Sequence, residues 1–220
     1  GKVLFPAACS TPEFIKTFKT LIATVNAYTA EAMWWCSRDP DYVAFSHSNL
    51  NVDKVFFWRD EDLKLHAGVL DWGGVACSSV GWKLWWWLYC CEYPFLSEAL
   101  DGLLECFIEE YHVHGGPLLD RDELRWQFCL AALVQGVGLL DAVPQIYRMC
   151  PKRHWPAIRD RHDARIAANV DGKNTLRVYI GTFVNICSMI SEWGIPERFD
   201  RWVDEVVALT GMARKSVLVP

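Results

Sequence analysis

The chain has 220 residues, of which 52% are hydrophobic and 22% are charged, and its formal net charge is −5. This composition suits one globular domain with a sizeable core and excludes long disordered tails. The negative charge argues against a nucleic-acid groove, which needs a clustered basic surface. The densest basic stretch, from Lys152 to Arg165, is interleaved with Asp160 and Asp163, and we interpret it as a solvated face rather than a phosphate-binding patch.

The sequence carries no transmembrane signal and no metal-finger signal. Its longest apolar run, Leu84 to Cys91, has eight residues, far fewer than the roughly 20 that span a bilayer. The nine cysteines contain no CxxC pair and most have apolar neighbours. We therefore predict no transmembrane span, no bound metal, no disulfide, and an intracellular reducing compartment, either the cytosol or an organelle interior.

A leading helix is predicted near the N-terminus. Ser10-Thr11-Pro12-Glu13 supplies a hydroxyl cap and a proline in the first turn. Apolar residues then recur every three or four positions from Phe14 to Val25, so the helix is expected to continue to about Cys36. Asp39-Pro40-Asp41 ends it.

Three short β-like stretches follow, at residues 42–46, 55–58 and 65–70. Four charged residues, 59–62, separate the last two stretches, which are therefore predicted to pair as a hairpin. Together the three stretches predict a small β-patch at about 42–71.

After Asp71 the chain is predicted to be helical almost throughout. The candidate helices cover roughly residues 81–92, 94–113, 120–140, 173–192 and 196–210, and a less regular segment lies at 144–174. The predicted fold is thus mainly α, of the α+β kind, in a single domain over residues 1–220. Within it we expect a leading helix at 1–40, the β-patch with its loop at 41–72, and a helical bundle at 73–220.

A spaced pattern of polar residues surrounds the β-patch. His47 is followed at +2 by Asn49 and at +7 by Lys54, and Asp71 stands at the end of the hairpin. Kinase chemistry uses a loop in which the +2 residue is an Asp that receives the substrate proton and the +7 residue is an Asn that holds magnesium. A second metal-holding Asp follows the next hairpin, which is the position of Asp71.

Residues 46–72 resemble the catalytic core of aminoglycoside phosphotransferases, choline kinases and related small-molecule kinases. The usual pattern of that family is His-Gly-Asp-Leu-His, then Asn, then a hairpin that ends in Ile-Asp-Trp or Ile-Asp-Phe. Here His47, Leu50, Val55 and the segment Val69–Trp72 match it. The resemblance covers residues 40 to about 140 and implies the helical C-lobe of a kinase-like fold, with a degenerate catalytic loop.

The departures from the family pattern bear on function. The amide of Asn49 cannot accept a proton at neutral pH, and a general base contributes on the order of 10²–10⁴ in rate. Lys54 brings an ammonium group to a position where a hard cation needs an oxygen ligand. Ser48 and Asn51 replace the family's Gly and His. The family's N-terminal β-lobe is not recognisable before His47, so it is either lost or belongs to a part of the precursor outside this chain.

These departures lead us to expect no catalytic residue at His47, Asn49, Lys54 or Asp71. We interpret His47 as structural. Asp71 is either a metal ligand or the cap of the next turn, and it is the only metal-ligand candidate. We predict that the ammonium of Lys54 lies near the carboxylate of Asp71, in a partly buried cleft, where the family holds magnesium.

Three hypotheses for function follow. The first is a non-catalytic, pseudokinase-like module without a cofactor, which acts as a binding or structural subunit of a larger assembly. Its 12 tryptophans suit a contact surface with a protein partner. The second is a small-molecule phosphotransferase that uses ATP and magnesium and whose N-lobe is absent from this chain. The third is a helical structural protein whose kinase resemblance is accidental.

Overall fold

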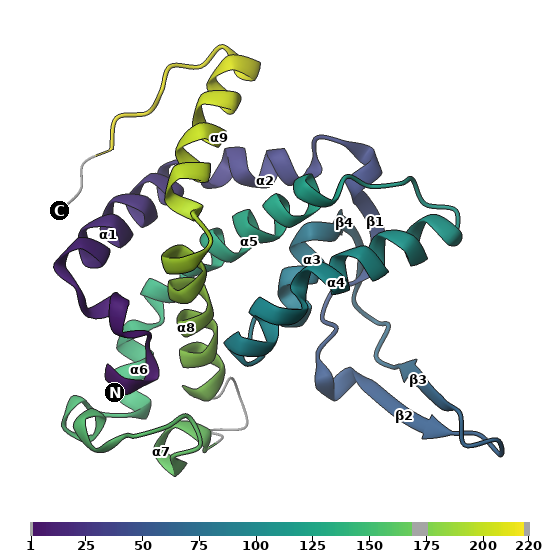
Figure 1. Ribbon diagram of the computed structural model, residues 1–220, viewed down its shortest axis with the longest axis horizontal. Coiled ribbons are helices and arrows are strands. Elements are labelled where there is room, and N and C mark those ends of the chain that lie inside the picture. Colours follow the sequence, from purple (N-terminus) through teal and green to yellow (C-terminus); the bar gives the residue numbers. More distant parts are fainter. Residues whose placement is uncertain (1, 169–175, 218–220) are drawn as a thin grey trace. The chain divides into compact units, whose positions relative to one another are not determined.

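The computed structural model describes residues 2–168 and 176–217. The described fold is mainly helical with two small antiparallel sheets, which confirms the predicted mainly α class. In chain order the helices and strands are α1 (Pro12–Ala27), α2 (Thr29–Ser37), β1 (Val43–His47), β2 (Val55–Arg59), β3 (Leu65–Val69), β4 (Val75–Ser79), α3 (Val80–Leu88), α4 (Tyr93–Val113), α5 (Arg121–Asp141), α6 (Val143–Met149), α7 (Ala164–Ala167), α8 (Leu176–Glu192) and α9 (Ile195–Thr210) (Figure 1).

The chain folds into two compact units, each of which is assembled from separate stretches of sequence. Unit 1 comprises Gly1–Met33, Tyr89–Leu100 and Ala132–Pro220, and unit 2 comprises Trp34–Leu88 and Asp101–Ala131. The dividing points fall inside α2, α4 and α5, and between α3 and α4. A single domain over 1–220, with subdivisions at 40/41 and 72/73, stays a prediction.

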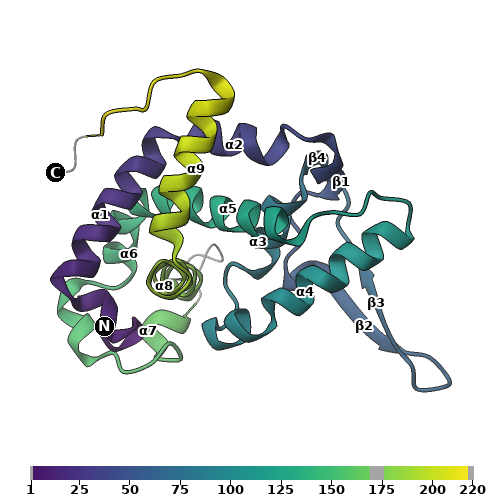
Figure 2. The same cartoon turned by 45° about the horizontal axis from the view of Figure 1, so that its top comes forward.

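Unit 1 is built around α8, which contacts α1, α6, α7 and α9. In Figure 2, α8 is seen nearly along its axis, with α1, α6 and α7 around it. Isoleucine and other apolar side chains of α8 are buried along its length, and Trp202 and Phe199 of α9 are buried beside Tyr28. Burial of a helix on several faces is typical of a central core helix.

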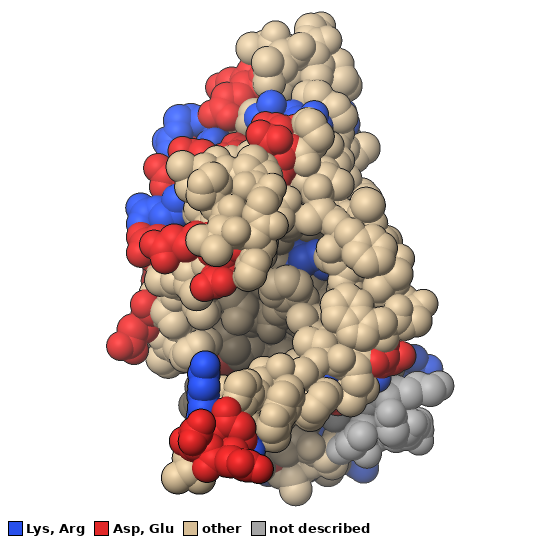
Figure 3. All heavy atoms as spheres, turned by 90° about the vertical axis from the view of Figure 1, so that its right-hand side faces the viewer, with Lys and Arg blue, Asp and Glu red and all other residues tan. Residues whose placement is uncertain are grey.

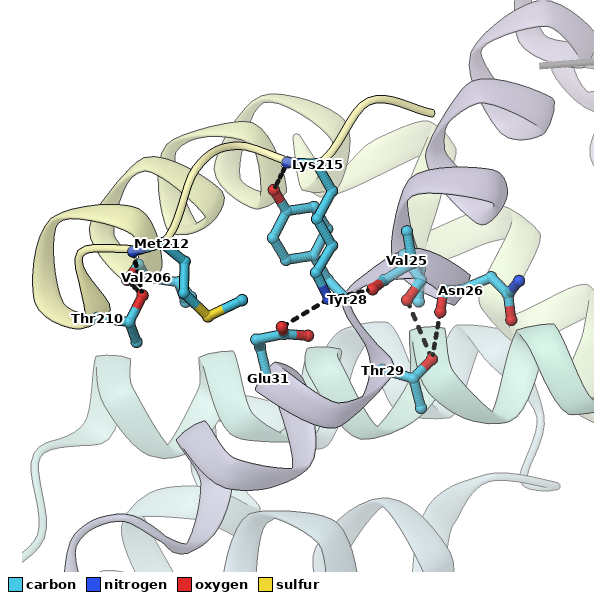
Figure 4. Close-up of polar contacts among 10 residues, drawn as sticks. Val25, Asn26, Tyr28, Thr29, Glu31, Val206, Thr210, Met212 and Lys215 are labelled. Carbon is cyan, nitrogen blue, oxygen red and sulfur yellow. Dashed lines mark hydrogen bonds and ion pairs between the residues drawn. The ribbon is translucent and has the colours of Figure 1, made fainter. Parts of the chain in front are cut away.

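The leading helix begins as predicted but ends earlier. Thr11 caps α1 by accepting a hydrogen bond from the backbone N–H of Phe14 at 3.1 Å. The prediction of one helix to about Cys36 is wrong, because the chain breaks at Tyr28, between α1 and α2. There the hydroxyl of Thr29 donates to the carbonyl oxygens of Val25 and Asn26, which belong to the last turn of α1 (Figure 4).

A C-terminal strap, residues 211–217, crosses this helix break. The backbone N–H of Lys215 donates to the Tyr28 hydroxyl at 2.7 Å, and its ammonium lies 4.8 Å from the centroid of the Tyr28 ring. The same ammonium donates to the Ala27 carbonyl and pairs with Glu31, each at 2.6 Å (Figure 4). Arg214 pairs with carboxylates of α9. The strap therefore supplies a donor to a carbonyl that the helix break leaves open.

Removing this contact is expected to destabilise unit 1. The variant Lys215→Met keeps the aliphatic stem but leaves the mostly buried Glu31 carboxylate without its cation, and should lower the free energy of unfolding by about 1–2 kcal/mol in urea. Lys16→Met, on the exposed side of α1, is the matched control and should change it by less than about 0.5 kcal/mol. Equal effects of the two variants would contradict a specific role for the strap.

Unit 2 contains all four strands of the described residues. The predicted hairpin is confirmed: β2 pairs with β3, with Val55 opposite Val69 and Arg59 opposite Leu65. The prediction missed β4, which pairs with β1 in a separate sheet, with Val43 opposite Ser79 and His47 opposite Val75. The β region thus extends beyond residue 71. Strand β4 was missed because its strand structure depends on its pairing with β1.

A buried polar network fixes the end of β4 against α5. The Ser79 hydroxyl donates to the Gln127 side chain at 3.2 Å, and Gln127 donates to Glu123 at 3.0 Å. Glu123 also accepts from the Trp35 indole at 2.9 Å. A Cβ at Gly81 would lie 2.5 Å from the Cβ of Gln127, so α3 can approach α5 this closely only because glycine is present. The network supports β4 and, through it, β1.

The predicted helices 94–113, 120–140 and 196–210 are confirmed within one residue or so at each end as α4, α5 and α9. Helix 173–192 corresponds to α8, with positions 173–175 outside the described residues. Helix 81–92 ends early, at Leu88, where the carbonyls of Tyr89 and Cys91 accept from the Asn185 amide instead. The segment 144–174 is less irregular than predicted, because it contains α6, a 3-10 helix at Lys152–Ala157, and α7.

Within the described ranges, no single helix is long and apolar enough to cross a membrane. The bent pair α5 and α6, with a 59° angle between them, passes that test together, by length and composition only. All nine cysteines carry free thiols, four of them buried.

Candidate functional site

The residues singled out by the kinase-like pattern all lie in unit 2. Strand β1 ends at His47, a loop leads to β2, and the chain returns from β3 to Asp71. Two backbone hydrogen bonds close the arrangement: Leu70 N–H donates to the Lys54 carbonyl at 3.0 Å, and Ser48 N–H donates to the Gly74 carbonyl at 2.7 Å. The pattern's four residues therefore belong to adjoining ends of the two small sheets.

The imidazole of His47 connects these loops. Its Nδ1 accepts from the backbone N–H of Asn49 at 3.1 Å, so Nε2 carries the proton and donates to the Leu70 carbonyl at 3.1 Å. His47 is 4% exposed, and its ring packs edge-on against Trp72, with 5.1 Å between ring centroids. Both ring nitrogens are thus used within the fold, which agrees with a structural role for His47.

The predicted ion pair between Lys54 and Asp71 is confirmed. The Lys54 ammonium lies 3.0 Å from the Asp71 carboxylate and 3.3 Å from that of Asp53. The expectation that this pair lies in a partly buried cleft is wrong, because the Asp71 side chain is 54% exposed. The Asp71 backbone has a φ of 67°, in the left-handed region that non-glycine residues seldom adopt. The local fold therefore holds the carboxylate beside the lysine with the Asp71 backbone in an unfavourable conformation.

Charge stabilisation within the pair shifts the pKa values of both groups. The hydrogen bond from Lys54 is the main cause that lowers the pKa of the Asp71 carboxyl below its usual value. The bond to Asp71 is likewise the main cause that raises the pKa of Lys54. Because the Asp71 pKa is depressed in the folded state, the stability from this pair is present above the unfolded-state pKa of about 3.9. That stability is lost as the pH falls through the folded-state value.

A carboxyl titration tests this coupling. In the variant Lys54→Met, the pKa of Asp71 is expected to rise toward about 3.9, because its main stabilising donor is gone. The measurement is a ¹³C NMR titration of the Asp71 side-chain carboxyl. Lys64→Met, in the exposed hairpin turn, should leave the Asp71 titration unchanged. An Asp71 pKa that is unchanged by the loss of Lys54 would show that the pair is absent in solution.

Asn49, which stands where the resembled family has its general base, is also engaged in an internal contact. The Asn51 amide donates to the Asn49 side-chain oxygen at 2.7 Å. The two residues that replace the family's Asp and His therefore bond to each other. Neither side chain titrates at neutral pH, so the pair cannot accept a substrate proton.

The donor set at Asp71 does not fit magnesium. Magnesium requires oxygen ligands in near-octahedral geometry, whereas the nearest partner of the Asp71 carboxylate is an ammonium nitrogen. Among residues 2–168 and 176–217, no group of three or more His, Cys, Asp or Glu side chains could hold a metal ion. Of the two readings of Asp71, a metal ligand is therefore disfavoured by its surroundings.

The sequence interpretation missed Lys83, which belongs to the same loop cluster. This lysine of α3 donates from its ammonium to the Ser48 carbonyl at 3.2 Å, and burial lowers its pKa. The sequence does single out Lys83, because it is the one charged residue in the segment Gly81–Leu88, which is otherwise apolar and tryptophan-rich. A second internal lysine thus fastens the loop that follows His47.

Comparison of the chain with protein-family models, curated proteins and solved structures gave no match. The resemblance to small-molecule kinases therefore depends on residues 46–72 and on the layout of the helices that follow them.

Proposed function

We propose that this chain is a kinase-like module that binds a protein partner and does not transfer phosphoryl groups. The observation that carries the proposal is the ion pair of Lys54 with Asp71 at 3.0 Å. The order of strand, loop, hairpin and Asp that the resemblance implies supports it as well.

The ion pair bears on catalysis because phosphoryl transfer depends on positioning and on metal charge. An ammonium that neutralises the Asp71 carboxylate competes directly with a divalent cation for the same oxygen atoms. The internal bond between Asn49 and Asn51 leaves the loop without a proton acceptor. Charge stabilisation and proton transfer are therefore both compromised at the site where active members of the resembled family perform them.

A binding role is supported by apolar surface on unit 2. Seven large apolar side chains of the two sheets and their loops are between 44% and 68% exposed: Phe45, Phe56, Phe57, Trp58, Leu65, Leu70 and Trp72. Figure 3 looks onto the right-hand side of Figure 1, where hairpin β2–β3 lies, and uncharged side chains cover much of that surface. Exposed apolar patches of this kind mark interaction sites, and a two-stranded hairpin is marginally stable when nothing covers it.

The test combines nucleotide binding, turnover and self-association of the purified 220-residue chain. Titration with ATP, with and without magnesium, is expected to show no magnesium-dependent binding and no turnover. Sedimentation should show concentration-dependent self-association that Phe57→Ser reduces, because Phe57 is 64% exposed on the hairpin. Magnesium-dependent ATP turnover that Asp71→Ala abolishes would overturn the proposal and favour the phosphotransferase alternative. A strict monomer at all concentrations would count against the binding role.

A further inference from the structure

Unit 1 contains an open cavity of about 690 Å³ that the proposed function does not use. Its wall is formed mainly by apolar and aromatic side chains, among them Ile146, Trp155, Ile180 and Phe183. Small-molecule sites are typically concave, largely apolar and roughly 300–1,000 Å³ in volume, with a few polar groups that orient the ligand. The cavity has the size and lining of such a site.

Among the residues that the structure describes, the charged side chains in the lining of this cavity are two cations, Lys152 and Arg159. Both come from the basic stretch that the sequence suggested was a solvated face. Other cations of that stretch are used internally: Arg161 pairs with Glu92 at 2.5 Å. Lys152 lies 4.9 Å from the centroid of the Tyr147 ring, which also lines the cavity.

Arg165 likewise pairs internally, with Asp163 at 2.5 Å. By contrast, Lys152 and Arg159 form no ion pair with a carboxylate in the part of the chain that the structure describes. An apolar wall beside two cations that form no ion pair among the described residues is complementary to a molecule with a hydrocarbon body and an anionic head.

We propose that this cavity binds a single-chain amphipathic anion of the fatty-acid class. The carboxylate would be held by Lys152 and Arg159, since a guanidinium matches a carboxylate in a bidentate geometry. The acyl chain would lie against Ile146, Ile180 and Phe183, where its apolar surface is removed from water. This site belongs to unit 1, whereas the candidate site belongs to unit 2, and the proposal is independent of the proposed function.

The probe is dodecanoate, titrated below its micellar concentration into the full 220-residue chain and followed by calorimetry. Saturable binding of one dodecanoate per chain is expected, with dodecanol and dodecyltrimethylammonium at least about tenfold weaker because neither carries an anionic head. The double variant Lys152→Ala/Arg159→Ala should weaken dodecanoate by at least about tenfold and leave dodecanol unchanged. Arg153→Ala is the matched control, because Arg153 is exposed in the same 3-10 helix as Lys152 but does not line the cavity.

A second variant locates the acyl chain. Ile146→Trp fills part of the cavity and should abolish binding of both dodecanoate and dodecanol, with circular dichroism used to verify that the helices persist. Equal affinities for dodecanoate and dodecanol, or binding that none of these variants changes, would overturn the proposal as adsorption elsewhere. Binding to phosphatidylglycerol vesicles without binding of monomeric dodecanoate would also overturn it, in favour of a membrane-surface role for the basic stretch.

Discussion

The variant Trp202→Ala is expected to lower the free energy of unfolding by about 3–5 kcal/mol, the range for truncating a large aromatic residue in a core. Trp202 is fully buried, and its ring lies 5.0 Å from that of Phe199 and 6.3 Å from that of Tyr28, measured between centroids. Tyr28 marks the break between α1 and α2 and receives the C-terminal strap. The cavity left by the indole would therefore loosen α9, the helix break and the strap together. Urea denaturation followed by circular dichroism measures the effect.

The matched control on the same helix is Leu209→Ala. Leu209 is 61% exposed, so its truncation should change stability by no more than about 0.5 kcal/mol. A loss below about 1 kcal/mol for Trp202→Ala would contradict the role of α9 as a core element.

The same experiment tests the predicted single domain. Trp85 is buried in unit 2 and packs edge-on against Phe128 at 5.2 Å. If residues 1–220 unfold as one cooperative domain, Trp85→Ala and Trp202→Ala should both shift one common transition. Two transitions, each moved by only one of the variants, would show that the two units unfold separately.

The helix ends that the sequence predicted well are those that carry local signals. Thr11 caps α1, Asp120 accepts from the backbone N–H of Glu123 at 2.7 Å to begin α5, and Gly211 ends α9 with a φ of 69°. These signals act within one turn of the residue that carries them, so they can be read without knowing the fold.

The features that the sequence did not predict depend on contacts between distant residues. Strand β4, Val75–Ser79, pairs with β1, which lies much earlier in the chain. The helix break at Tyr28 follows the apolar period that runs from Phe14 to Val25, and Lys215 contacts the break from the other end of the chain. Periodicity does not report such long-range hydrogen bonds, because it describes only which face of a segment is apolar.

At the candidate site, the resemblance to small-molecule kinases predicted which residues meet but not their environment. The resemblance implies that Lys54 and Asp71 stand where the family holds magnesium, and this led to the prediction of their ion pair. The exposure of Asp71 was not predictable in this way, because it depends on what surrounds the hairpin. The bond between Asn49 and Asn51 was missed for a related reason, since the two were considered separately, as substitutions.

Exchanging Lys54 for the residue that the resembled family has at that position should create a divalent-cation site. In Lys54→Asn, the repelling ammonium beside Asp71 is removed and a side-chain amide oxygen takes its place. Asp53 contributes a second nearby carboxylate, now 3.3 Å from the Lys54 ammonium. The affinity for Mn²⁺, measured by the paramagnetic relaxation of water protons, is expected to rise by at least about tenfold over the natural chain.

Two further variants separate charge from ligation in this experiment. Lys54→Met removes the ammonium without adding an oxygen ligand, so its affinity for Mn²⁺ should lie between those of the natural chain and Lys54→Asn. Asp71→Ala combined with Lys54→Asn should cancel the gain, because Asp71 is the carboxylate that the lysine now holds. Equal Mn²⁺ affinity in the natural chain and in Lys54→Asn would mean that the ammonium does not compete with a cation at Asp71. The ion pair would then no longer support the proposal that the chain does not transfer phosphoryl groups, and that proposal would depend on the amide at Asn49.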